Sequence, residues 1–150
     1  MMANITILND AQSSELRKKY IQSFVDSRSE YYAEHILAMK QCRDGLCYDG
    51  YLWDCLAAPT VVSETEAHRA LHEKENFYIL WDIHSCEKIW IPHYWKYPKA
   101  SVLRAEKWTD ALRKELPEDI YLFDDSFQWS VIFTHETDES EESYCLLCRK

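Results

Sequence analysis

Glycine is scarce in this sequence, which has only Gly45 and Gly50 among its 150 residues. Glycine-rich phosphate loops and the G-x-S-x-G turn of serine hydrolases both need closely spaced glycines at defined positions. Here both glycines stand in one segment, CRDGLCYDGY, which predicts a loop between a helical N-terminal third and the remainder of the chain. The sequence therefore predicts neither a glycine-rich phosphate loop nor a nucleophilic serine elbow.

Long apolar runs and basic clusters are missing as well. No segment approaches the roughly 20 apolar residues that span a bilayer, and the opening MMANITILNDAQ lacks the basic and apolar regions of a secretion signal. The 26 acidic and 17 basic residues give a net charge of −9, which repels nucleic-acid backbones and favours a basic protein partner. We therefore expect a cytoplasmic protein that binds neither membranes nor nucleic acids.

What is present is an ordinary soluble composition, 47% hydrophobic and 29% charged, in a length that fits a single domain spanning residues 1–150. Helical spacing and capping signals fill the N-terminal third, and residues 100–115 have the spacing of a further helix. Alternating apolar residues predict strands at 77–84, 88–93, 120–123 and 128–135, with YCLLCRK as the last strand. We predict an α+β fold in which N-terminal helices pack on an antiparallel sheet of about five strands built from two hairpins.

The segment DDSFQWSVIFTHE, residues 124–136, places carboxylates near a histidine and could be taken for a catalytic centre. In the expected hairpin Tyr121 pairs with Val131, which leaves DDSFQ as the connecting loop. His135 then lies roughly 20 Å from that loop, whereas proton transfer requires contact at about 3 Å. Alternation places His135 on the core-facing side of the strand and Glu136 on the other side. The segment therefore predicts a hairpin and no catalytic residues.

Three stretches are similar to landmarks of a known family. YLWDCL at 51–56, IYLFDDSFQW at 120–129 and VIFTHE at 131–136 resemble segments of a bacterial family of uncharacterised proteins, domain of unknown function 4275. The resemblance covers roughly Tyr51 to Glu136 and departs after THE, where TDESEESYCLLCRK replaces a glycine- and aromatic-containing ending. Since no catalytic residues are established for that family, the resemblance implies a small cytoplasmic bacterial protein and no site.

Two histidines have the spacing of half a metal site. AHRALHE places His68 and His72 four residues apart on one helix face, but Arg69 stands where a zincin has glutamate. We therefore predict no metal and no other cofactor, and we interpret this helix face as solvated. A metal-dependent enzyme built on His68 and His72 stays open as an alternative, as does a sensor domain that binds a small ligand.

Six cysteines are present, and in a cytoplasmic protein they predict reduced, mostly buried thiols. Cys145 and Cys148 have the spacing of a redox motif, but residues three apart on a strand point to opposite faces and do not bridge. Cys42 and Cys47 flank a glycine, which lets them approach and leaves open whether this pair oxidises.

Two segments predict a binding surface. IWIPHYWKYP gathers aromatic side chains around two prolines, and such aromatics anchor protein interfaces. ETDESEE concentrates carboxylates that attract a basic partner. The alternatives are a loop folded back on the core and a solvated acidic loop. The candidate protein-binding residues are Trp90, Tyr94, Trp95, Tyr97, Asp138, Glu139, Glu141 and Glu142.

The leading functional hypothesis is a non-enzymatic, acidic protein-binding module. Its most specific form is an immunity-type inhibitor that masks a basic toxin such as a nuclease. In this hypothesis the net charge steers association and the aromatic side chains hold the complex together.

Overall fold

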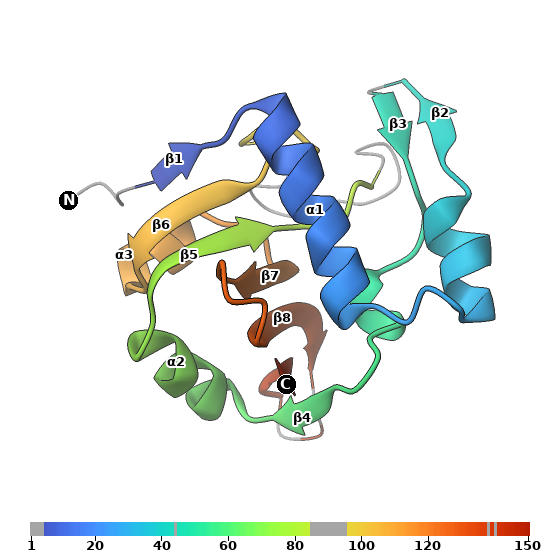
Figure 1. Cartoon of the computed structure of the whole chain (residues 1–150). Helices are drawn as coiled ribbons and strands as arrows, with labels where there is room; N and C mark the ends of the chain where they lie inside the picture. Colours follow the sequence, from blue (N-terminus) through green and yellow to red (C-terminus); the bar gives the residue numbers. More distant parts are fainter. Residues whose placement is uncertain (1–4, 44, 85–95, 138, 140) are drawn as a thin grey trace.

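The computed structural model describes residues 5–43, 45–84, 96–137, 139 and 141–150, which contain both helices and strands. Seven antiparallel strands form one sheet in the order β1-β6-β5-β7-β8-β9-β4, and β2 and β3 form a separate two-stranded sheet beside it (Figure 1). The strands are β1 Ile5–Ile7, β2 Lys40–Cys42, β3 Gly45–Cys47, β4 Thr60–Val62, β5 Glu75–Leu80, β6 Leu103–Lys107, β7 Ile120–Phe123, β8 Trp129–Thr137 and β9 Ser143–Arg149.

The helices begin at polar caps that the sequence supplies. Asn9 and Gln12 form a capping box at the start of α1, and the hydroxyls of Ser63 and Thr109 accept from main-chain N–H groups at the starts of α2 and α3. Such caps satisfy amides that have no partner within the helix. The helical elements are α1 Asp10–Phe24, a π-helix Tyr32–Leu37, a 3-10 turn Leu52–Asp54, α2 Glu64–His72 and α3 Asp110–Lys114.

Hydrophobic cores cover both faces of the large sheet. One core contains Tyr20 and Phe24 of α1 with Leu80, Tyr121 and other residues of one sheet face. A second core joins α2 and α3 to side chains of the opposite face. Strand β7 is buried at every position, because its alternate side chains enter the two cores in turn. The sheet therefore lies between two layers, one formed by α1 with the 48–56 segment and the other by α2 with α3.

The predicted α+β class is confirmed, but the estimate of about five strands is wrong, since the large sheet has seven. Strand β5 lies where the 77–84 prediction begins, and it pairs with β6 and β7. The predicted strand at 88–93 lies outside the described residues, as does most of the hairpin to which it was assigned. Short strands supply the additional sheet members, and β1 and β4 have only three residues each.

The helix predicted for residues 100–115 is wrong. Leu103–Lys107 is a strand that pairs with both β1 and β5, and only Asp110–Lys114 is helical. Leu103 and Ala105 are buried while Arg104 is exposed, so this stretch also satisfies a period of two. Hydrogen bonding on both sides by β1 and β5 selects the strand, and the Thr109 cap starts the helix afterwards.

The hairpin around DDSFQ is confirmed, with β7 ending at Phe123 and β8 beginning at Trp129. Its register differs by one residue from the prediction, because Tyr121 pairs with Ile132 and Val131 pairs with Leu122. The expected placement of His135 on the core-facing side is wrong, since its side chain is 37% exposed. An irregularity between Phe133 and Thr137 interrupts the alternation on which that expectation depended.

Cysteine pairing differs in part from the prediction of reduced thiols. Cys42 and Cys47 form a disulfide across β2 and β3, whereas Cys55, Cys145 and Cys148 are buried thiols. As expected, Cys145 and Cys148 enter opposite cores of the sheet. Within the described ranges, no helix is both long enough and apolar enough to cross a bilayer.

Candidate binding face

A histidine and a buried carboxylate pair at the end of the β7–β8 hairpin opposite the DDSFQ loop. Asp119, which is 4% exposed, accepts from the His135 main-chain N at 2.8 Å and from its Nδ1 at 3.0 Å to each carboxylate oxygen. These contacts hold the imidazole so that its Nε2 edge is directed away from Asp119. Burial raises the pKa of Asp119, and the neighbouring His135 opposes that rise.

A second buried carboxylate, Asp82, holds residues 51–53, the YLW segment, against the sheet. Tyr48 Oη and the Leu52 main-chain N donate to Asp82 Oδ1, each at 2.9 Å, and Tyr121 Oη donates to Oδ2 at 2.7 Å. Tyr121 Oη also accepts from the Trp53 main-chain N at 2.9 Å. Desolvation raises the pKa of Asp82, and its hydrogen bonds and the nearby His84 lower it. The network fixes the backbone of residues 52 and 53 from beneath.

Tyr51 consequently lies at the surface between two imidazole rings. Its ring centroid is 4.6 Å from that of His84 and 5.3 Å from that of His135, and Trp53 packs beside it at 4.8 Å. Burial, followed by the charges of Asp119 and Asp82, raises the pKa of Tyr51 to about 12. The phenol therefore stays protonated at neutral pH, where it offers a hydrogen-bonding hydroxyl and an aromatic face.

The π-helix continues this aromatic surface through close contact at Gly50. Tyr31 Oη accepts from the Tyr51 main-chain N and donates to Asp54, both at 3.1 Å, and the Tyr31 ring lies 4.6 Å from that of His35. A Cβ at Gly50 would stand 2.6 Å from the His35 Cβ, so only glycine permits this approach. We name the surface made by Tyr31, His35, Tyr51 and His135 the histidine–tyrosine face.

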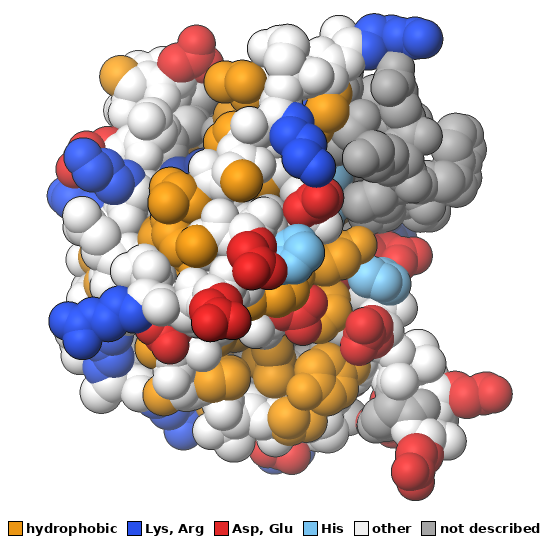
Figure 2. All heavy atoms as spheres, turned by 90° about the vertical axis from the view of Figure 1, so that its right-hand side faces the viewer, with side chains coloured by type: hydrophobic (Ala, Val, Ile, Leu, Met, Phe, Trp, Pro, Cys, Tyr) orange, Lys and Arg blue, Asp and Glu red, His pale blue; other side chains and the backbone are white. Residues whose placement is uncertain are grey.

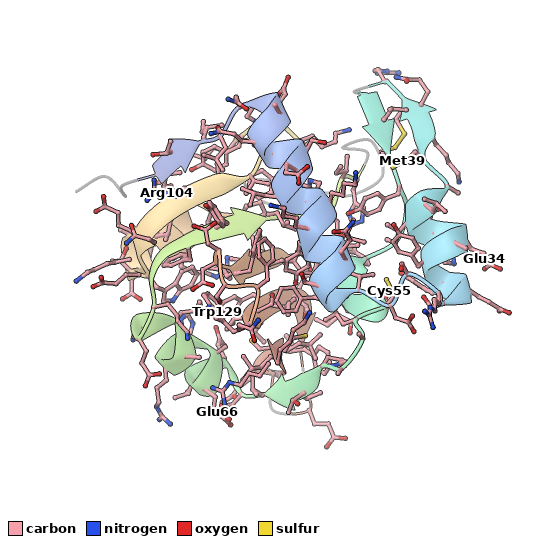
Figure 3. The ribbon with its side chains drawn as sticks, in the orientation of Figure 1. Glu34, Met39, Cys55, Glu66, Arg104 and Trp129 are labelled. Carbon is pink, nitrogen blue, oxygen red and sulfur yellow. A yellow bond between two sulfur atoms is a disulfide. The ribbon has the colours of Figure 1, made fainter. Side chains whose placement is uncertain are left out.

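Exposed apolar side chains adjoin this face on the arm formed by the π-helix, β2 and β3. Leu37 is 65% exposed, Met39 41% and Leu46 56%. Figure 3 labels Met39 on this arm and Glu34 on the π-helix below it. Asp49 connects β2 to the face, since its carboxylate lies 3.3 Å from both Lys40 Nζ and His35 Nδ1. The arm therefore presents apolar side chains beside carboxylates and imidazoles.

The same side of the molecule is shown as a surface in Figure 2. Acidic side chains and histidines are interspersed there with hydrophobic side chains, and most Lys and Arg side chains in this view lie toward the edges. Aromatic rings flanked by carboxylates are the surroundings that arginine and lysine side chains prefer, through cation–π contact and charge-assisted hydrogen bonds. The arrangement is suited to binding a basic protein surface.

The predicted aromatic segment is only partly described. Trp90, Tyr94 and Trp95 lie outside the described residues. Tyr97 is half-buried and packs on Trp81, with ring centroids 5.8 Å apart. Tyr97 therefore contacts the core that contains α2 and α3, as the alternative of a folded-back loop predicts.

The predicted acidic segment forms the connection between β8 and β9. Glu139, Glu141 and Glu142 are exposed, and Asp138 lies outside the described residues. Glu141 has a φ of 63°, in the left-handed region. These carboxylates add to the negative charge of a surface loop, as the solvated interpretation and the docking interpretation both require.

The remaining sequence candidates are separate from the face. His68 Nδ1 accepts from Trp108 Nε1 at 2.9 Å and its Nε2 lies 3.7 Å from Glu64, while His72 is exposed. The described part of the chain contains no group of three side chains placed to hold a metal. Asp125 accepts from Tyr78 Oη at 2.8 Å, so this loop aspartate and His135 belong to different sites, as predicted.

Sequence reasoning missed the residues that organise the face. Asp82 and Asp119 were not singled out, because a single acid in an apolar strand or before one gives no periodic signal. Tyr51 and His135 lie within the family-like segments YLWDCL and VIFTHE. The contact between the two side chains depends on the sheet and cannot be read from either segment. Within residues 124–136 the acids available to His135 are Asp124, Asp125 and Glu136, whereas its carboxylate partner in the structure is Asp119.

Comparison with known families identifies this chain as a member of one of them. The family model Domain of unknown function (DUF4275) matches residues 3–144, so the chain belongs to that family, and the match extends well before Tyr51. No curated protein and no solved structure matches the chain significantly.

Proposed function

We propose that this member of the DUF4275 family is a non-enzymatic protein-binding module that acts as an immunity-type inhibitor of a basic toxin such as a nuclease. The observation that carries the proposal is the histidine–tyrosine face, where half-buried aromatic rings, carboxylates and exposed apolar side chains adjoin. Interfaces combine aromatic anchors with a charged rim in this way. The net charge of −9 supports fast association with a cationic partner. A cytoplasmic location forms part of the proposal.

The partner would contact the arm and the face together. Leu37, Met39 and Leu46 provide apolar area, and Asp49 and Asp54 provide negative charge at its border. The aromatic segment and the acidic loop remain proposed additional contacts. The aromatic candidates are Trp90, Tyr94, Trp95 and Tyr97.

The proposal is tested by titrating the chain against the basic protein encoded beside it, with isothermal calorimetry at several salt concentrations. Leu46→Ser is expected to weaken binding about tenfold or more, the effect of removing an interface anchor worth more than ~1.4 kcal/mol. Val61→Ser is the matched control, since Val61 is 60% exposed on β4 of the large sheet, whereas Leu46 is 56% exposed on β3.

Electrostatic steering gives the second readout. The association rate should fall steeply as salt rises, because the partners' opposite charges are then screened. The proposal fails if no basic neighbour binds, if Val61→Ser weakens binding as much as Leu46→Ser, or if association is independent of salt.

A further inference from the structure

A hollow of about 420 Å³ between α1 and the π-helix is lined by cationic and hydroxyl-bearing side chains. Arg17 and Lys18 of α1 form part of its wall, with Ser14, Gln22 and Ser27 around them. No acidic side chain lines this hollow in the described part of the chain. A positive hollow is unexpected on a chain whose net charge is −9, so its charge calls for a separate explanation.

Arg17 is the unusual member of this wall. Its side chain is 9% exposed, and Nη1 donates to the Trp81 carbonyl at 2.8 Å. Nε and Nη2 are buried, and neither has a hydrogen-bond partner among the described residues. Buried polar groups in native proteins are nearly always paired, so unpaired guanidinium nitrogens indicate a bound water or ion.

Among the described residues, no carboxylate forms a hydrogen bond with the Arg17 guanidinium. Asp82 and Arg17 both lie near Tyr48, and they shift its pKa in opposite directions. Arg17 nevertheless makes no hydrogen bond with Asp82. Asp82 instead accepts from Tyr48, Tyr121 and Leu52. Glu34 of the π-helix lies on the side away from α1 (Figure 3). Neither of these carboxylates therefore pairs with the Arg17 guanidinium.

Lys18 adds a second, accessible charge. It is exposed and makes no ion pair within the described ranges, whereas the next residue, Lys19, lies 3.8 Å from Glu15. The hydroxyls of Ser14 and Ser27 and the Gln22 amide are further donors in the same wall. Two cations with several neutral donors match a phosphate dianion better than a single carboxylate.

The remaining wall is apolar. Ile21, about one turn along α1 from Arg17 and Lys18, and Tyr32 of the π-helix also line the hollow, and both are half-buried. Small-molecule sites have volumes of about 300–1,000 Å³ and combine apolar walls with a few polar groups. From these observations we infer that the hollow between α1 and the π-helix binds a small phosphate monoester, with its phosphate over Arg17 and Lys18 and its organic part against Tyr32 and Ile21.

The inference is tested on the full chain with phenyl phosphate and inorganic phosphate as probes, at constant ionic strength maintained with sodium chloride. Calorimetry and thermal unfolding should show saturable binding of both, and tighter binding of phenyl phosphate because its ring contacts the apolar wall. Lys18→Gln should weaken phenyl phosphate about tenfold, the loss of one charge-assisted contact. Lys19→Gln, on the same helix but paired with Glu15, should remain within about twofold of wild type.

Several outcomes overturn the inference. These are the absence of saturable binding, equal losses in the Lys18 and Lys19 variants, no preference for phenyl phosphate over phosphate, or binding of benzoate as tight as that of phenyl phosphate. Because Arg17→Met removes a buried group and could unfold the chain, Ser14→Ala is the second test of the same wall and should also weaken binding. None of these measurements depends on the proposed partner, so the two proposals fail independently.

Discussion

Tyr121→Phe should strongly destabilise the protein, because one hydroxyl completes two buried hydrogen bonds. Tyr121 is fully buried, donates to Asp82 Oδ2 at 2.7 Å and accepts from the Trp53 main-chain N at 2.9 Å. Phenylalanine retains the ring and its packing. The substitution therefore removes the polar link between the YLW segment and the sheet with little change in apolar contact.

The magnitude follows from the two partners that remain. A hydrogen bond to a charged group contributes about 1.5–3 kcal/mol, and a buried amide left without an acceptor costs about 1–3 kcal/mol. Together they predict a loss of about 2.5–6 kcal/mol in the free energy of unfolding. That is a large part of the ~5–15 kcal/mol typical of a folded domain.

Two other tyrosines calibrate this value. Tyr48→Phe removes one bond to Asp82 and should cost about 1.5–3 kcal/mol. Tyr78→Phe removes an exposed bond to Asp125, where water replaces the lost partner, and should change stability by less than about 0.5 kcal/mol. Urea unfolding followed by circular dichroism gives the three differences, and equal m-values would show that the same surface is exposed in each variant.

The double variant of Tyr48 and Tyr121 adds a test of coupling. Both hydroxyls donate to Asp82, so their effects should not be additive. The reasoning is refuted if Tyr121→Phe costs no more than Tyr78→Phe, or if the two losses at Asp82 simply add.

Two further predictions concern the same region. Burial raises the pKa of Asp82 above its ordinary value, so the unfolded chain loses this proton first and stability should fall as pH rises from about 4 through the raised native pKa. In Asp82→Asn the slope of unfolding free energy against pH should be less negative over that window than in the wild type, while Tyr48 and Tyr121 stay protonated. Equal slopes in the wild type and the variant would contradict the assignment of this pH dependence to Asp82. Gly50→Ala should displace His35, whose Cβ would lie 2.6 Å from the new methyl, and should weaken partner binding. Gly45→Ala, which meets no atom within 4 Å but has a φ of +111°, should reduce stability through backbone strain alone and leave the His35 NMR signals in place.

Local patterns predicted several elements correctly. Ser63 with Glu66 marked the start of α2, and the apolar alternation around the DDSFQ loop marked the hairpin of β7 and β8. These features depend on neighbouring residues, which the sequence displays directly. The hairpin register was displaced by one, because both faces of β7 and β8 are buried and a strictly alternating pattern is therefore lacking.

Other elements were decided by distant residues. Leu103–Lys107 fits either a helix or a strand, and its two neighbours β1 and β5 select the strand. The three-residue strands β1 and β4 are too short to give a periodic signal, and they exist because longer strands supply their hydrogen-bond partners. The pairing of Cys42 with Cys47 was open in the sequence and depends on the arm that brings β2 beside β3.

By itself, the sequence determined the acidic balance, the α+β class and the family, because composition, short-range spacing and motif are properties of the chain. Only the tertiary structure brought His135 to Asp119, Tyr51 between two imidazoles and Asp82 beneath residues 52 and 53. These contacts join residues separated by 16 to 84 positions. A buried carboxylate is stable only when the folded chain surrounds it with donors, so its position is a property of the packed sheet.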